Sequence, residues 1–174
     1  MTNLNKAHEI EMIKRIQHGD DEALITFLQG ISHQLSLMAY SYLQNEADVE
    51  DVISEMTIVV YKKRKQPVDP AYFKTWVISI LIHKCRDLLR KRRQWVQIDD
   101  DDAIVNDVDE PLDFVYDYIN ELKIHHREVV LLKTVQELTF NEIALLLNEP
   151  EGTIKKRYYS ALKLLRLKME DLYA

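Results

Sequence analysis

The chain has 174 residues, of which 47% are apolar and 30% charged, and its formal net charge is −6 at pH 7. This apolar content is enough to bury a core in one or two small domains, which excludes a disordered chain. The single cysteine, Cys85, excludes an internal disulfide. No apolar run approaches the roughly 20 residues of a membrane span, and the N-terminus lacks a secretory apolar core. We therefore expect a cytoplasmic protein without direct membrane insertion.

The sequence predicts an all-α fold with two helical domains joined by an acidic flexible linker. Only three Gly and four Pro interrupt the chain, and no segment sustains the alternation of apolar and polar residues that is typical of strands. We expect the first domain over residues 1–95, the linker over 96–111 and the second domain over 112–174.

Four helices are predicted in the first domain, over residues 4–17, 21–43, 47–65 and 71–93. Gly19 and Asp20 end the first helix and cap the second. Asn45 separates the second from the third, and Pro67 with Pro70 forces a turn before the fourth.

The third predicted helix is amphipathic. Its apolar residues at helical spacing are expected in the core: Val49, Val52, Ile53, Met56 and Val60. Its other face carries Asp48, Asp51 and Glu55. Spacing alone leaves two interpretations of this acidic face open, a solvated surface and a surface that binds a partner.

The fourth predicted helix combines aromatic, apolar and basic residues. Its apolar side begins with Tyr72, Phe73 and Trp76 and continues through Val77, Ile80, Leu81, Leu88 and Leu89. Beside it runs a stripe spaced four, three, four and three residues apart: Ser79, His83, Arg86, Arg90 and Arg93. Such a stripe could follow a phosphate backbone, and neighbouring aromatic rings could stack on unpaired bases. Alternatively, Phe73 or Trp76 belongs to the core, and Asp87 pairs with Arg90 or Lys91.

The net charge conceals two blocks of opposite sign. Residues 61–95 hold eleven basic and two acidic side chains, whereas residues 96–122 hold ten acidic side chains and no Lys or Arg. Self-repulsion and low apolar content make the start of the acidic block a linker.

A helix-turn-helix unit is predicted between residues 138 and 165. Thr139 and Glu142 form a capping box at the start of its first helix, and Leu138 with Ile143 forms a hydrophobic staple. The helix breaks at residues 148–150, and Pro150 suits the first turn of the next helix.

The second helix of this unit has separate apolar and polar faces. The apolar face comprises Ile154, Tyr158, Ala161 and Leu165, and the polar face comprises Thr153, Lys156, Arg157 and Ser160. This pattern is typical of a recognition helix that lies in the major groove, although a hairpin with a solvated basic face would share it. Gly152 favours the recognition helix, because glycine there suggests close approach to the preceding helix or to a phosphate.

Six short segments occur in a characteristic order: DVEDVISE at 48–55, FKTWV at 73–77, Asp87 with Arg90, REVV at 127–130, LTFNEIA at 138–144 and GTIKKR at 152–157. Together they closely resemble the extracytoplasmic-function (ECF) sigma factors of the sigma-70 family, over nearly the whole chain. The first three are similar to conserved regions 2.2, 2.3 and 2.4, and the last three to regions 4.1 and 4.2.

The resemblance implies an alternative sigma factor that binds core RNA polymerase and directs promoter-specific transcription initiation, with no enzymatic activity, cofactor or metal. Polymerase would be bound at the β′ clamp helices, through Asp48, Asp51 and Glu55, and at the β flap. The implied contacts to the −10 element of promoter DNA are Phe73, Lys74, Trp76, His83, Arg86, Asp87, Arg90 and Arg93. Those to the −35 element are Thr153, Lys155, Lys156, Arg157 and Ser160. An anti-sigma factor, commonly membrane-attached in this family, is a further expected partner.

The sequence departs from the family pattern at several positions. Ser54 replaces the usual Gln of region 2.2, His83 replaces an Asn, and Lys123 replaces a proline before region 4.1. The usual His-Arg pair after the recognition motif is Tyr159-Ser160 here. The contacts made by the family's usual Gln, Asn and His-Arg side chains therefore do not carry over to this chain, in which His83 and Ser160 are candidates in their own right.

Three alternatives remain open from the sequence. A free-standing helix-turn-helix regulator would bind DNA without polymerase, but it would leave the basic stripe unexplained. A sigma-like decoy would bind a protein without promoter activity. An enzyme is the third, but its candidate residues, His33, His83, His125 and His126, lack ligand or triad spacing with carboxylates or Cys85.

Overall fold

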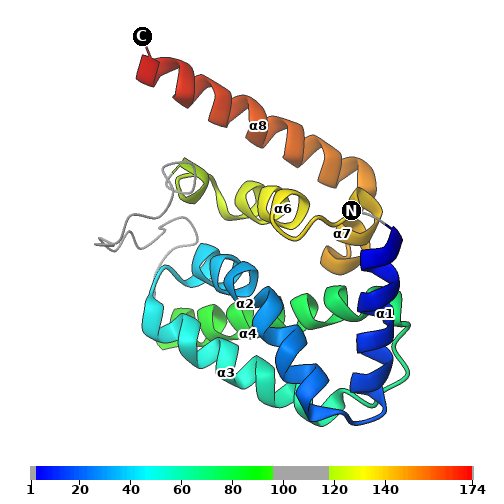
Figure 1. Ribbon diagram of the computed structural model, residues 1–174. Coiled ribbons are helices and arrows are strands. Elements are labelled where there is room, and N and C mark those ends of the chain that lie inside the picture. The colour runs from blue at the N-terminus through cyan, green and yellow to red at the C-terminus, as the bar shows by residue number, and fades with distance from the viewer. Residues whose placement is uncertain (1–2, 96–117, 174) are drawn as a thin grey trace. The chain divides into compact units, whose positions relative to one another are not determined.

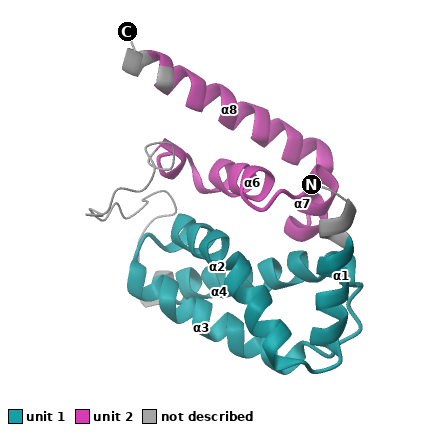
Figure 2. Cartoon of the chain, viewed as in Figure 1, with its two compact units in different colours: residues 1–102 teal, residues 103–174 magenta. Residues whose placement is uncertain are grey.

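The computed structural model describes residues 3–95 and 118–173 (Figure 1). For residues 3–6, 93–95, 169 and 171–173 it describes the backbone alone. The predicted linker at 96–111 lies outside the described residues. The chain divides into two compact units, residues 1–102 and 103–174 (Figure 2). Every regular element of the described residues is a helix, which confirms the predicted all-α class.

The part of the first unit that the structure describes contains four long helices and one short one. They are α1 (Asn3–Gln17), α2 (Asp21–Leu43), α3 (Glu46–Lys63), the 3-10 helix η1 (Pro70–Tyr72) and α4 (Phe73–Trp95). Helices α2, α3 and α4 pack against one another in pairs, while α1 contacts α2 and η1. The core between them is apolar, with Met38, Met56 and Val60 almost completely buried.

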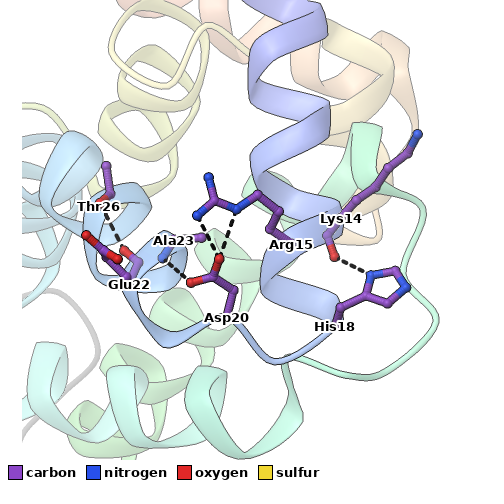
Figure 3. Close-up of polar contacts among 7 residues, drawn as sticks. All are labelled: Lys14, Arg15, His18, Asp20, Glu22, Ala23 and Thr26. Atoms are coloured by element: carbon purple, nitrogen blue, oxygen red, sulfur yellow. Dashed lines mark hydrogen bonds and ion pairs between the residues drawn. The ribbon is translucent and has the colours of Figure 1, made fainter.

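The junction of α1 and α2 shows why the helices end where the sequence predicts (Figure 3). Gly19 has a φ of +96°, which favours glycine. Asp20 then caps α2, because its carboxylate accepts the backbone N–H of Ala23 at 3.0 Å. That bond and the hydrogen bond from Arg15 keep the pKa of Asp20 below its usual value.

Asn45 caps α3 in the same way. Its side-chain oxygen accepts the backbone N–H of Asp48 at 3.0 Å. The apolar face of α3 follows the prediction at Val49, Val52, Met56 and Val60, which are buried. Ile53 is only half-buried.

The buried face of α4 is wider than predicted and rotated. Besides the expected Phe73, Val77 and Leu81, the helix buries Ile78, Ile82 and Cys85. The predicted Ile80, Leu88 and Leu89 are only half-buried. The reason is that α4 packs against both α2 and α3, so more than one apolar stripe is covered. Burial raises the pKa of the Cys85 thiol to about 12, so the thiol is protonated near neutral pH.

The second unit contains α6 (Ile124–Thr134), α7 (Phe140–Leu147) and α8 (Glu151–Tyr173). The predicted capping box is present at the start of α7. The Thr139 hydroxyl accepts the Glu142 backbone N–H at 3.2 Å, and the Glu142 carboxylate accepts the Thr139 N–H at 2.7 Å. Helix α6 packs against both α7 and α8, and the shared core includes Val129, Ile143 and Ile154, each 0% exposed.

Two charged residues of α6, Arg127 and Glu128, are buried inside the second unit. Arg127 is 4% exposed and donates hydrogen bonds to the carbonyl oxygens of Asn120 and, at 2.9 Å, of Leu122. It thereby attaches the start of α6 to the segment that precedes it. Burial lowers the pKa of Arg127, but an arginine stays protonated near neutral pH even so.

Candidate functional site

The acidic face of α3 is only partly open. Asp51 is exposed, and the side chain of Glu55 is 61% exposed although it pairs with Lys84 at 2.9 Å. That hydrogen bond lowers the pKa of Glu55, which keeps it ionised at neutral pH. By contrast, the Asp48 side chain is 14% exposed and pairs with Arg92 at 2.5 Å. The sequence predicts that Asp48 lies on an exposed face of α3. In the structure, Arg92 of α4 covers it.

The pairs Asp48–Arg92 and Glu55–Lys84 join α3 to α4, and we call them the α3–α4 ion pairs. The residues advance along α3 as their partners go back along α4, so the helices run antiparallel. Two basic side chains of α4 are thereby engaged by the acidic face. Asp51 lies between the pairs in sequence, and Asp51 and Glu55 carry the exposed negative charge of this face.

The basic stripe of α4 lies mainly on the surface. His83, Arg86 and Arg90 are exposed, and the Nδ1 atom of His83 lies 2.6 Å from the Ser79 carbonyl oxygen. Arg90 pairs with Asp87 at 3.0 Å, as one interpretation of the sequence expected. For Arg93 the structure describes the backbone only.

Two of the aromatic residues at the start of α4 have different environments. Phe73 is 0% exposed, and its ring centroid lies 5.5 Å from that of Phe27 and 5.2 Å from that of Trp76. Trp76 and Lys74 are half-buried. A fully buried ring cannot stack on a base, so Phe73 belongs to the core, whereas Trp76 has an accessible side.

The polar face of α8 is arranged as the sequence predicts. Lys155, Lys156 and Ser160 are exposed and Thr153 is half-buried, while Ile154 and Ala161 are 0% exposed on the opposite face. Lys155 pairs with Glu151 at 2.6 Å, and this hydrogen bond raises the pKa of Lys155. The face thus presents cations and hydroxyl groups, the side chains that contact phosphates and base edges.

Arg157 differs from the other basic residues of α8, because it is held by the turn. Its Nη1 atom lies 2.8 Å from Oε1 of Glu149, and the side chains of Arg157 and Glu149 are 25% and 32% exposed. Arg157 also lies close enough to the start of α6 for its charge to act on the two histidines there. Burial lowers the pKa of His125 and of His126, and the positive charges of Arg157 and Lys123 lower both further.

Of the two explanations predicted for Gly152, close approach to the preceding helix is excluded. A Cβ atom built at Gly152 would meet nothing within 4 Å. The described residues therefore do not require a glycine at position 152 for packing. The other explanation, that Gly152 approaches a phosphate, stays a prediction.

Sequence reasoning missed the partners of the site residues. Lys84, Arg92 and Glu149 were not predicted to hold Glu55, Asp48 and Arg157. Lys84 and Arg92 are separated from their partners by 29 and 44 residues, and no local spacing rule connects them. Glu149 lies eight residues before Arg157, which is two helical turns, but the intervening turn conceals that relation.

Models of two regions of one protein family match this chain. The model "Sigma-70 region 2" matches residues 32–95 and the model "Sigma-70, region 4" matches residues 115–165. A relative of nearly equal length is the ECF RNA polymerase sigma factor SigW of Bacillus subtilis, 27% identical over 179 residues, with 92% of this chain and 96% of SigW covered. The chain belongs to the ECF sigma factors of the sigma-70 family.

Other relatives of this ECF sigma factor are sigma factors as well. RNA polymerase sigma factor SigV of Bacillus subtilis is 27% identical over 161 residues, with 86% of this chain and 93% of SigV covered. The ECF sigma-E factor of Escherichia coli is 22% identical over 180 residues, with 92% and 94% covered.

Two solved structures share the fold. CnrH, solved in complex with the cytosolic domain of CnrY, has a TM-score of 0.68 at 20% identity, and the likeness covers 94% of this chain and 97% of CnrH. The sigma factor RpoE, solved with the anti-sigma factor NepR from Bartonella quintana, has a TM-score of 0.67 at 22% identity, with 83% and 97% covered.

The described residues of this sigma factor contain neither a candidate metal site nor a candidate membrane span. No group of three or more His, Cys, Asp or Glu side chains among them is arranged to hold a metal ion. None of the helices described is long and apolar enough to cross a membrane.

Proposed function

We propose that this chain is an alternative sigma factor that binds core RNA polymerase and directs transcription initiation at a specific set of promoters. The observation that carries the proposal is the presence, in one chain, of a unit matching sigma region 2 and a helix-turn-helix unit matching sigma region 4. A free-standing regulator would require only the second. We assign region 2 to residues 1–95, region 4 to 112–174 and the linker to 96–111.

Polymerase binding is assigned to the acidic face of α3. The exposed carboxylates of Asp51 and Glu55 supply negative charge that suits a basic partner surface, which we take to be the β′ clamp helices. Asp48 is a weaker candidate, because its side chain is 14% exposed and paired with Arg92. The β flap is the proposed partner of region 4.

Promoter contacts are assigned to α4 and α8. On α4, His83, Arg86 and Arg90 offer exposed polar and basic groups to the −10 strand, and Trp76 offers a ring for stacking. Lys74, Asp87 and Arg93 stay in this proposed set, and Phe73 is removed from it because it is buried. On α8, the polar face meets the −35 element through Thr153, Lys155, Lys156, Arg157 and Ser160.

An anti-sigma factor is the proposed regulatory partner. CnrH and RpoE, which share this fold, were each solved with a bound protein, and that of RpoE is an anti-sigma factor. We propose a similar partner here, attached to the membrane while the sigma factor acts in the cytoplasm without enzymatic activity of its own.

The first test is co-elution with bacterial core RNA polymerase on a sizing column at moderate salt. The purified chain should elute with polymerase, and the complex should give run-off transcripts that core enzyme alone does not. A folded chain that elutes alone would contradict the proposal and favour a free-standing regulator, which a search for a dimer would then test.

Reversing the charge of the docking face should prevent that co-elution. In the double variant Asp51→Lys/Glu55→Lys, two exposed carboxylates become ammonium groups, so attraction to a basic partner becomes repulsion. The matched control is Glu9→Lys/Glu11→Lys, the same change at two exposed positions of α1. Both variants should keep a wild-type circular dichroism spectrum. Equal co-elution of both with polymerase would remove the acidic face of α3 as the docking surface.

Trp76→Ala should impair promoter melting. Losing one base-stacking ring costs about 1 to 3 kcal/mol, so open complexes should form less completely, while Trp76→Phe should retain much of the activity. Permanganate reactivity of unpaired thymines measures the melting. Tyr61→Ala removes an exposed aromatic ring from α3 and serves as the control. Normal melting by Trp76→Ala would return Trp76 to a purely structural role.

A further inference from the structure

The turn between α7 and α8 is fixed at the level of its backbone. Asn148 has a φ of 54°, in the left-handed region, and the backbone N–H of Glu149 donates to the Ala144 carbonyl oxygen at 3.0 Å. Pro150 follows, and its carbonyl oxygen accepts the N–H of Thr153 at 2.9 Å. Glu149 is therefore held by its backbone at the end of α7, one residue before the proline that accepts the first hydrogen bond of α8.

The side chain of Glu149 reaches across to the recognition helix. Its Oε1 atom accepts a hydrogen bond from Nη1 of Arg157 at 2.8 Å, and both side chains are about two-thirds buried or more. A charge-assisted hydrogen bond between partly buried side chains is stronger than one between solvent-exposed side chains. It restricts the many rotamers that an arginine otherwise samples.

The surroundings make Glu149 the decisive partner of Arg157. Two side chains at the start of α6, those of His125 and His126, lie close enough to Arg157 for its positive charge to lower their pKa. Glu149 alone among the groups described here supplies a negative charge at hydrogen-bond distance.

A restrained arginine reads DNA differently from a free one. Phosphates attract any arginine that can reach them and carry no sequence information. Reading a guanine edge needs two N–H groups in a fixed orientation. A guanidinium has five N–H donors, so a single bond to Glu149 can set the orientation and leave donors for a base.

We propose that Glu149 is a positioning residue that sets the base preference of the recognition helix by orienting Arg157. The inference rests on the proposed function, since it assumes that the chain selects promoters as part of a polymerase holoenzyme. Glu149 acts through Arg157 and does not need to touch DNA. Removing its charge should therefore relax sequence choice more than it weakens binding.

The experiment uses the full chain assembled with bacterial core RNA polymerase. A pool of linear promoters with randomised upstream and −10 sequences is transcribed, and barcodes in the transcripts are sequenced, which gives a base-preference profile for each variant. For Glu149→Gln, which keeps the shape and removes the charge, we expect the preference at the base that Arg157 reads to fall by about threefold to tenfold. The preferences within the −10 sequence should be unchanged.

Two further variants separate positioning from other effects. Glu170→Gln removes the carboxylate of the Arg166–Glu170 pair on the same helix, which has a contact of 2.7 Å, and thus makes the same change in net charge away from the turn. Its profile should match that of the wild type. Adding Glu149→Gln to Arg157→Ala should change the profile no further, because the residue to be oriented is already gone.

Three results would overturn the inference. One is an unchanged upstream profile for Glu149→Gln, whether or not thermal unfolding shows the variant to be less stable. Another is an effect of Glu149→Gln that persists without Arg157, which would mean that Glu149 contacts DNA itself. The third is the absence of any selected promoter with the wild-type chain, which would overturn the proposed function as well and is recognised before any variant is compared.

Discussion

Replacing Phe73 by alanine should lower the free energy of unfolding of the first unit by about 3 to 5 kcal/mol, as is typical of deleting a buried ring. Phe73 is 0% exposed and contacts the rings of Phe27 and Trp76. The cavity would lie where α4 begins, so the helix carrying the proposed −10 contacts would lose its anchor. Denaturant unfolding followed by tryptophan fluorescence measures this, because both tryptophans, Trp76 and Trp95, precede residue 96.

A matched control is Ile25→Ala, which shortens an apolar side chain that is 56% exposed on α2. Its unfolding free energy should change by less than about 0.5 kcal/mol. If Phe73→Ala were as stable as this control but failed to melt promoters, Phe73 would be a DNA contact after all, as the family resemblance implies.

Arg157→Ala should weaken binding of the holoenzyme to promoters that contain the upstream element by about 1 to 3 kcal/mol, if Arg157 reads a base. The variant loses the base contact and leaves the Glu149 carboxylate without its Arg157 partner. Binding to a series of promoters with single changes in the upstream element measures the effect, at fixed salt. Across this series, the Arg157→Ala holoenzyme should no longer discriminate between bases at one position of the upstream element.

Lys156→Ala provides the comparison, because Lys156 is exposed on the same face and suits a phosphate contact. It should weaken binding about equally across sequences and reduce the salt slope by about 1. If Arg157→Ala behaved in the same way, Arg157 would contact phosphate only. The proposed role of Glu149 in base preference would then fail with it.

Helix ends could be predicted from the sequence because they depend on neighbouring residues. The capping box of Thr139 and Glu142 and the cap of Asn45 use atoms only three residues apart. Gly19 likewise adopts the positive φ that its position between two helices suggests. These hydrogen bonds join residues that are close in sequence, so they depend little on how the helices pack.

Features that depend on the crossing of helices could not be predicted. The apolar spacing of α4 is compatible with several faces, and only its contact with both α2 and α3 decides that Ile78 and Ile82 are buried. Asp48 similarly belongs to an acidic face by spacing, but Arg92 covers it from α4. At the candidate site, the sequence therefore supplied the exposed groups, while the structure supplied the partners that orient them.

The short helix α7 has a consequence for how promoter choice can change. It has eight residues, too few to be stable alone, and depends on its capping box, its left-handed end at Asn148 and its buried side chains. Among the contacts described, none of these features involves Lys156 or Ser160. New combinations of side chains at Lys156 and Ser160 therefore leave the scaffold intact, so duplicated copies of such a gene could acquire different regulons without first acquiring stabilising mutations.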